Sequence, residues 1–143
     1  MNKKIIIIVP NSNKYPSNIM VPFIRKTWGD NKDIQTIIYQ GESSKDYLDS
    51  KNNLYLNVPG GYEHLTQKLL KALDWVDKNL DYDYVLRTTT TSYIDINNLK
   101  KFINKLPSSS LYCSTPVTYP PYPHEKKDEI IFGSGAGVIL SKD

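Results

Sequence analysis

Ile5-Ile6-Ile7-Ile8-Val9-Pro10 is the longest uninterrupted apolar run in the sequence. Its β-branched residues are apolar at consecutive positions, which is typical of a strand that is buried on both faces in the centre of a parallel sheet. Pro10 ends the run. The run therefore predicts a central strand of an α/β fold.

Strands and helices are predicted to alternate along the rest of the chain. Stretches rich in β-branched, apolar or aromatic residues predict strands at 34–39, 54–58, 82–86 and 111–117, with two short apolar pieces at 130–132 and 138–140. Apolar residues at spacings of three and four predict a long amphipathic helix at 62–80. Shorter helices are expected at 17–28, within 41–53, and at 96–105, where Asp95 is the predicted N-cap.

This alternation predicts βαβ units and a mostly parallel, Rossmann-like sheet flanked by helices. In such sheets, ligands bind beyond the carboxyl ends of the strands, at the switch in strand order. Two loops meet that condition: 10–17, after the first strand, and 87–93, after the strand at 82–86. No internal repeat or linker is recognisable, so residues 1–143 predict a single domain.

Composition excludes several classes of protein. The net charge is +3, from 18 Lys and Arg against 15 Asp and Glu, and the basic residues are scattered rather than clustered as nucleic-acid binding usually requires. The apolar run at 5–10 is too short to cross a bilayer. Cys113 is the single cysteine, which excludes an internal disulfide and a structural zinc site. These features predict a cytoplasmic domain with no nucleic-acid partner and no membrane span.

The segment Arg87-Thr88-Thr89-Thr90-Thr91-Ser92 is the most unusual in the chain. Lysine is the common cation here, and arginine occurs only at Arg25 and Arg87. Five consecutive hydroxyls at the carboxyl end of a strand could donate hydrogen bonds to phosphate or sugar oxygens. The alternative is a polar connection in which a threonine caps the next helix.

Two further features also have alternative interpretations. Gly133-Ser134-Gly135-Ala136-Gly137 could be a phosphate-binding loop or a tight turn, and its GxGxG spacing and apolar continuation favour the turn. Lys68 lies on the predicted helix at 62–80, where a solvated lysine is the ordinary interpretation. His64 and His124 are isolated from each other and from cysteine, which argues against a metal role.

Four segments carry motifs of one enzyme family in the family's order. They are Phe23-Ile24-Arg25-Lys26-Thr27-Trp28, Tyr62-Glu63-His64-Leu65-Thr66-Gln67-Lys68 with Trp75 further on, Tyr84 to Leu99, and Phe132 to Asp143. They resemble the R-x-T-W, Y-x-N-L-T-x-K…W, K-x-D-D-D-x-F and G-x-G-Y-x-L-S-x-D signatures of the β-1,3-galactosyltransferase and fringe-like glycosyltransferases. The resemblance covers residues 22–143, most of the chain.

That family has the GT-A fold, an α/β nucleotide-sugar fold, and transfers a hexose from a UDP-sugar with inversion. The resemblance implies a nucleotide-sugar donor and a glycan or protein hydroxyl as acceptor. It assigns nucleotide-sugar binding to Pro10, Asn11, Arg25, Lys68, Arg87, Thr89, Thr90, Thr91, Gly133, Ser134 and Gly135. The two arginines would contact the donor phosphates, the threonines the diphosphate or sugar, and Gly133–Gly135 would line the sugar pocket.

The acidic triplet of that family is missing from this chain. In the family it holds Mn²⁺ or Mg²⁺ against the diphosphate, because hard divalent cations prefer carboxylate oxygens. The matching residues here are Thr89, Thr90 and Thr91, whose neutral hydroxyls cannot supply that charge. Either a cation such as Arg87 neutralises the donor diphosphate, or metal and donor binding are both lost.

A general base is not assigned by the resemblance either. In the family, the catalytic carboxylate and a metal-binding histidine follow the G-x-G segment, and this sequence ends at Asp143. We therefore expect a GT-A-like domain without the acceptor-side part. The motifs assign no residue to deprotonate the acceptor hydroxyl. Two alternatives to an active transferase stay open. One is a non-catalytic nucleotide- or glycan-binding module that kept the fold, and the other is an unrelated α/β domain.

Overall fold

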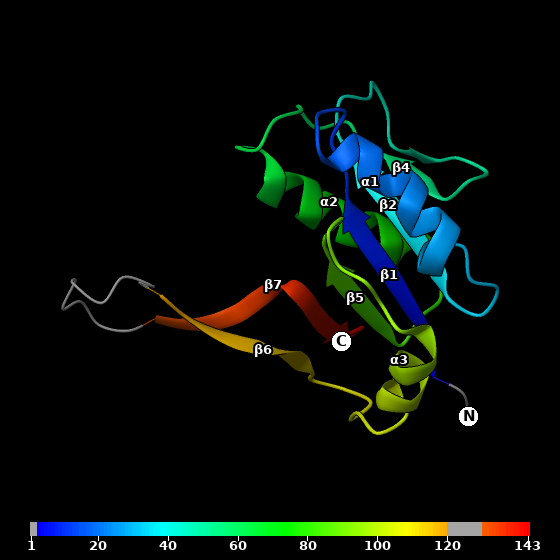
Figure 1. Ribbon diagram of the computed structural model, residues 1–143, viewed down its shortest axis with the longest axis vertical. Helices are drawn as coiled ribbons and strands as arrows, with labels where there is room; N and C mark the ends of the chain where they lie inside the picture. Colours follow the sequence, from blue (N-terminus) through cyan, green and yellow to red (C-terminus); the bar gives the residue numbers. More distant parts are fainter. Residues whose placement is uncertain (1–2, 120–129) are drawn as a thin grey trace.

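A computed structural model describes residues 3–119 and 130–143, which form a sheet with helices on both of its faces (Figure 1). The elements in chain order are β1 (Ile5–Pro10), α1 (Ser17–Ile24), the π-helical turn η1 (Arg25–Gly29), β2 (Gln35–Gln40), β3 (Tyr47–Leu48), β4 (Asn53–Tyr55), α2 (Leu65–Asn79), β5 (Tyr84–Thr88), α3 (Ile96–Ile103), β6 (Tyr112–Tyr119) and β7 (Ile130–Ser141). Across the described residues, seven strands form one sheet in the order β3-β4-β2-β1-β5-β7-β6. The predicted α/β class and the central position of β1 are confirmed.

The sheet is mixed rather than mostly parallel. β1 pairs in parallel with β2 and β5, and β2 pairs in parallel with β4, whereas the β3–β4, β5–β7 and β6–β7 pairs are antiparallel. A parallel return needs a crossover of a dozen or more residues. Only residues 120–129 separate β6 from β7, so the two strands run back along each other as a long ribbon that projects from the body (Figure 1). The parallel centre is compatible with a Rossmann-like fold.

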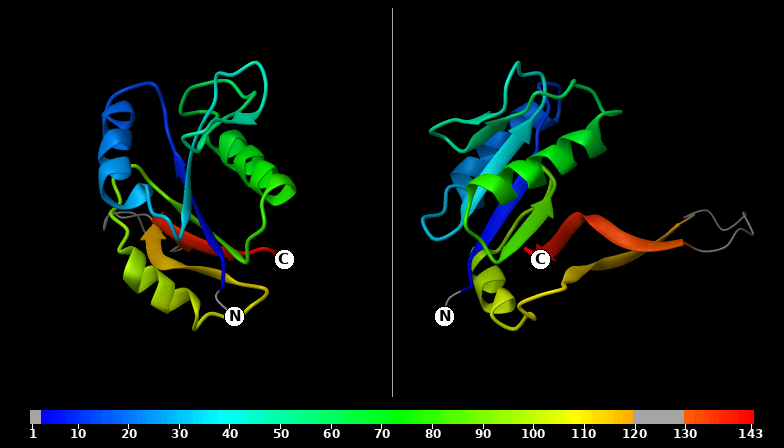
Figure 2. Two further views of the ribbon diagram at one scale, coloured as in Figure 1. Left: turned by 90° about the vertical axis from the view of Figure 1, so that its right-hand side faces the viewer. Right: turned by 180° about the vertical axis from the view of Figure 1, so that it is seen from behind.

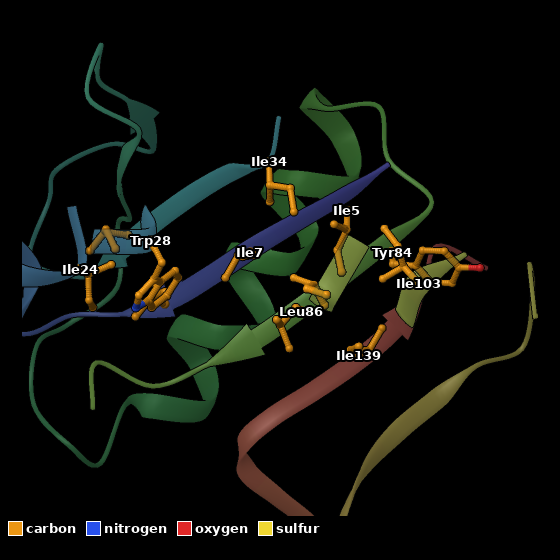
Figure 3. Close-up of a cluster of buried hydrophobic side chains, with 12 residues drawn as sticks. Ile5, Ile7, Ile24, Trp28, Ile34, Tyr84, Leu86, Ile103 and Ile139 are labelled. Carbon is orange, nitrogen blue, oxygen red and sulfur yellow. The ribbon is translucent and has the colours of Figure 1, made fainter. Parts of the chain in front are cut away.

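Alternate residues of β1 face opposite layers of the molecule. Ile5, Ile7 and Val9 belong to a cluster with Trp28 of η1 and with α1 and α3, part of which is drawn in Figure 3. Ile6 and Ile8 pack instead with the cluster that includes α2. The left panel of Figure 2 shows α1 and α3 on one side of the sheet and α2 on the other. Burial of β1 on both faces, which its consecutive β-branched residues predict, is therefore confirmed.

Two local predictions are wrong. The short helix expected within 41–53 is absent from that described segment, which instead holds β3, an edge strand whose Tyr47 ring stacks on Tyr55 of β4 at 4.7 Å between centroids. The glycine-rich segment at 133–137 is not a turn, because the pieces predicted at 130–132 and 138–140 belong to the single strand β7. Glycine lets β7 lie close to β6 there, since a Cβ at Gly133 would collide with the Tyr112 hydroxyl.

The other elements lie where the sequence predicts them, to within a few residues. The helix predicted at 62–80 is α2, and the one predicted at 17–28 is divided between α1 and η1. No helix among the described residues is long and apolar enough to cross a membrane. The predicted N-cap of α3 is confirmed, since the Asp95 carboxylate accepts a hydrogen bond from the backbone N–H of Asn98 at 2.9 Å. Asp95, and not a threonine, therefore caps the helix after β5.

Removing this cap should weaken the domain measurably. We expect Asp95→Ala to lower the free energy of unfolding by about 1 kcal/mol, because the first turn of α3 loses a hydrogen-bond acceptor. Asp95→Asn, which keeps an acceptor oxygen, should stay close to the wild type. Urea unfolding followed by circular dichroism measures both variants. Equal stability of Asp95→Ala and the wild type would show that α3 does not depend on its cap.

Candidate functional site

A cavity of about 670 Å³ lies at the carboxyl ends of β1, β2 and β5, beside the first residues of α2. Its wall is built from residues 10–14 after β1, residues 40–42 at and after β2, and several residues between 60 and 68. The wall is completed by Arg87 at the end of β5, by Thr89 and Thr90 of the loop that follows, and by Gly135 of β7. Because β1, β2 and β5 are parallel neighbours, their carboxyl ends meet at this edge of the sheet. The two loops selected from the sequence therefore meet at one cavity.

The structure brings together most, but not all, of the residues that the resemblance assigned. Those that line the cavity are Pro10, Asn11, Lys68, Arg87, Thr89, Thr90 and Gly135. Those that do not line it are Arg25, Thr91, Gly133 and Ser134. The sequence analysis missed several residues that also line it, among them Gln40, Gly41, Glu42, Gly60, Gly61 and Tyr62. Gly60 and Gly61 follow a strand, but that signal by itself predicts only a turn.

Arg25 has a different task from the one predicted. Its guanidinium donates to the backbone carbonyls of Thr36 and Asn52, both at 3.1 Å, and to the Asn53 side chain at 3.3 Å. An ion pair with Asp30 at 3.3 Å adds a fourth partner. Thr36 lies near the amino end of β2, whereas the cavity lies at its carboxyl end. Arg25 therefore ties η1 to β2 and β4 and does not reach the cavity.

Lys68 is buried, so the interpretation as a solvated lysine is wrong. Its side chain emerges from the second turn of α2 and is 5% exposed. The ammonium group donates to the carbonyl of Gly61 at 2.8 Å and forms no ion pair with a carboxylate of the described residues. Gly41 packs beside the stem of the lysine: a Cβ at this glycine would lie 3.3 Å from the Lys68 Cδ atom, and closer still, at 2.6 Å, to the Val58 carbonyl oxygen.

Like Lys68 and the exposed Lys14, Arg87 lines the cavity without a carboxylate partner within the part of the chain that the structure describes. It is half-buried at the end of β5, and its Nη1 atom donates to the carbonyl of Gly135 at 2.5 Å. Its Nε atom is buried and has no hydrogen-bond partner. Such groups are rare in folded proteins, and one that borders a cavity indicates a missing ligand or water.

Some of the hydroxyls of residues 88–92 form hydrogen bonds within the loop after β5 or to β7. The Thr88 hydroxyl donates to the Ala136 carbonyl at 2.7 Å, and the Thr89 hydroxyl lies 2.9 Å from that of Ser92 and 3.1 Å from that of Thr91. Thr91 itself is exposed outside the cavity. Only Thr89 and Thr90 therefore have positions from which they could contact a ligand in it.

Positive charge lies in the depth of the cavity, and the carboxylates at its wall are exposed. Glu42 accepts a hydrogen bond from the Asn13 side chain at 3.2 Å, and Glu63 pairs with His64 at 3.7 Å. The amino end of α2 also faces this region, and it has neither a side-chain cap nor an acidic residue in its first turn. The helix dipole places partial positive charge at this end of α2, which adds to the positive potential of Lys68 and Arg87. The arrangement can therefore hold an anionic group.

The residues of the cavity do not fit a divalent cation. Among residues 3–119 and 130–143, no three His, Cys, Asp or Glu side chains lie close enough together to hold a metal ion. At positions 89–91, after β5, the oxygen donors are threonine hydroxyls close to Arg87. A hard divalent cation prefers anionic oxygen ligands and is repelled by neighbouring positive charge.

A comparison with models of known protein families gives no match to this chain, and neither does a comparison with curated protein sequences. What the fold and the cavity define is an α/β domain with a candidate anion-binding site at the carboxyl edge of its sheet.

The structural role of Arg25 is testable without any ligand. Arg25→Met should lower the free energy of unfolding by about 2 kcal/mol, because the carbonyls of Thr36 and Asn52 lose a charged donor. The backbone amide chemical shifts of Lys68, Arg87 and Gly135 should stay unchanged, since the cavity lies at the opposite end of β2. Urea unfolding and ¹⁵N NMR spectra provide the two measurements. Shift changes at the cavity without a loss of stability would contradict this assignment.

Proposed function

We propose that this chain is a GT-A-like glycosyltransferase domain whose cavity binds a nucleotide-sugar, UDP-linked by resemblance to the β-1,3-galactosyltransferase family. The observation that carries the proposal is the presence of Lys68 and Arg87 on one cavity without carboxylate partners among the described residues. Withdrawing a charge from water is costly unless an opposite charge compensates it. The diphosphate of a nucleotide-sugar would supply that compensation.

The other residues of the cavity suit a ligand that has a polar, uncharged part in addition to its phosphates. Its volume of about 670 Å³ lies within the range of sites for small organic ligands. Elsewhere on the cavity wall, the Asn11 amide donates to the Gln40 side chain at 2.9 Å, and the Asn11 oxygen is buried without a hydrogen-bond partner. These groups suit the nucleoside part, and Lys68 and Arg87 suit the phosphates.

If the domain is active, its two cations stabilise the leaving group. In the transfer, a bond forms between the acceptor oxygen and the anomeric carbon, and the bond from that carbon to the β-phosphate oxygen breaks. The nucleoside diphosphate leaves with the electron pair, and the acceptor proton passes to a base. Lys68 and Arg87 would stabilise the charge that develops on the departing diphosphate.

A non-catalytic binding module is the second candidate function. It is favoured by the threonines at the positions that match the family's acidic triplet. The two candidates share the nucleotide site and differ in turnover. Release of free hexose or formation of glycoside from a UDP-sugar separates them.

Calorimetric titration with UDP and UDP-sugars tests the shared site directly. Because the proposed neutralising groups are side chains of the protein, we expect the affinity to be the same with Mn²⁺ and with EDTA. Binding that requires Mn²⁺ would contradict the role of the two cations. Absence of binding under both conditions would overturn the nucleotide-sugar site itself.

Neutral replacements of the two cations should weaken binding separately. We expect Lys68→Met and Arg87→Gln each to raise the Kd for UDP by about tenfold or more, equivalent to about 1.4 kcal/mol, because each removes a charge-assisted hydrogen bond to phosphate. Lys101→Met removes an exposed lysine on α3 and serves as the matched control. Its affinity should equal that of the wild type, and an equal loss in all three variants would indicate only a general charge effect.

A further inference from the structure

Tyr39 and Arg87 lie on the two sides of β1 and on the same face of the sheet. In the parallel register, Arg87 of β5 is opposite Ile8, and Tyr39 of β2 is opposite Pro10. Ile8 and Pro10 are two residues apart on β1 and so share one face. This is the face that α2 covers, because Ile8 and Tyr39 both belong to its cluster of buried residues. Figure 1 shows β2, β1 and β5 side by side.

The Tyr39 hydroxyl is buried without a hydrogen-bond partner, although the side chain is only 1% exposed. Burial raises its pKa to about 12, and the nearby Arg87 guanidinium acts in the opposite direction. The Nε atom of Arg87 is the other buried polar atom without a partner at this place. The two groups are complementary, because a guanidinium only donates hydrogen bonds and a phenol oxygen accepts them.

Gly135 of β7 contacts the Arg87 guanidinium as well. Its carbonyl accepts the hydrogen bond from Nη1 at 2.5 Å, and a Cβ at this position would lie 2.7 Å from the same nitrogen. The segment is fixed against the loop after β5, because the hydroxyls of Thr88 and Ser92 both donate to the Ala136 carbonyl, at 2.7 and 3.3 Å. A Cβ at position 135 would therefore require the guanidinium of Arg87 to shift from this position.

We infer that Tyr39 and Gly135 are positioning residues for the Arg87 guanidinium. The Gly135 carbonyl accepts from Nη1, and the Tyr39 hydroxyl is the acceptor that we assign to the Nε–H group, so that the remaining N–H groups face the phosphates of the ligand. The inference rests on the proposed function, because it assigns a purpose to the orientation of Arg87. Holding the side chain before the ligand arrives lowers the entropy lost on binding. It also gives a purpose to Gly135 within the glycine-rich segment, which is part of strand β7 and not a turn.

Removing the Tyr39 hydroxyl tests one half of this arrangement. Tyr39→Phe keeps the buried ring, and we expect it to raise the Kd for UDP about fivefold while the Kd for uridine, which has no phosphate, stays unchanged. Tyr82→Phe is the matched control, because Tyr82 is also a buried tyrosine. Tyr82 precedes β5 and lies away from the cavity, and its hydroxyl donates a hydrogen bond to Asp77 at 3.1 Å. That control should bind both ligands like the wild type.

Adding one methyl group to β7 tests the other half. Gly135→Ala should displace the guanidinium and raise the Kd for UDP by about tenfold. Gly137→Ala is its control, since a Cβ there would meet only the Leu86 side chain at an ordinary 3.9 Å. Calorimetry gives the affinity for UDP, and ¹⁵N NMR titration gives the weaker affinity for uridine.

The possible results separate the failure of this inference from the failure of the proposed function. If the wild type does not bind UDP, the nucleotide-sugar site and the inference fall together. If the wild type binds UDP and the variants at Tyr39 and Gly135 bind it equally well, only the inference is overturned. An equal loss of UDP and uridine binding would also overturn it, because that result indicates general damage to the fold. A loss confined to UDP in these two variants, with both controls unchanged, supports it.

Discussion

Burial of β1 on both of its faces is the constraint that organises this domain. Residues 5–9 are at most 5% exposed, so apolar layers must cover the strand from both sides. α1, η1 and α3 supply one layer, and α2 supplies the other. Both lateral neighbours of β1 run parallel to it, which leaves three carboxyl ends at the same edge of the sheet. The position of the cavity is thus a consequence of how the central strand is covered.

Polar groups are almost absent from this core, which makes the exceptions informative. The buried polar or charged residues of the described chain are Thr36, Lys68, Thr88 and Thr90. Three of these four lie at the cavity or directly beside its wall. Folded proteins bury polar or charged side chains in an apolar core mainly at functional sites. The concentration of such exceptions at one edge is therefore stronger support for a binding site than the cavity volume alone.

The features that were predictable from the sequence are those that neighbouring residues determine. The apolar run of β1, the spacing of leucines in α2 and the Asp95 cap each depend on a few consecutive residues. The burial of Lys68 was not predictable, because it depends on Gly41 and Gly61, which reach it only through the fold. The two arginines also look equivalent in sequence. Distant carbonyls of Thr36 and Asn52 decide that Arg25 is structural.

The ribbon of β6 and β7 could not be predicted from neighbouring residues either, because it also depends on contacts between distant parts of the chain. Short apolar pieces on either side of a glycine-rich segment look like separate elements when no pairing partner is known. In the fold, residues 130–133 and 138–140 of β7 pair with β6 on either side of a register irregularity, and residues 137–141 also pair with β5. Glycine then has a steric purpose, which is close approach to Tyr112 at one position and to Arg87 at another.

The neutral threonines at positions 89–91 and the lack of carboxylate partners for Lys68 and Arg87 among the described residues are connected by electrostatics. A site that binds a diphosphate through a divalent metal must itself be acidic, because the metal carries the positive charge. If Lys68 and Arg87 supply that charge instead, carboxylates at positions 89–91 would pair with Arg87 and repel the phosphates. Neutral hydroxyls avoid both effects and can still donate hydrogen bonds to phosphate oxygens. On the proposed function, the threonines are thus the residues that a metal-independent phosphate site needs at these positions, rather than a remnant of a metal site.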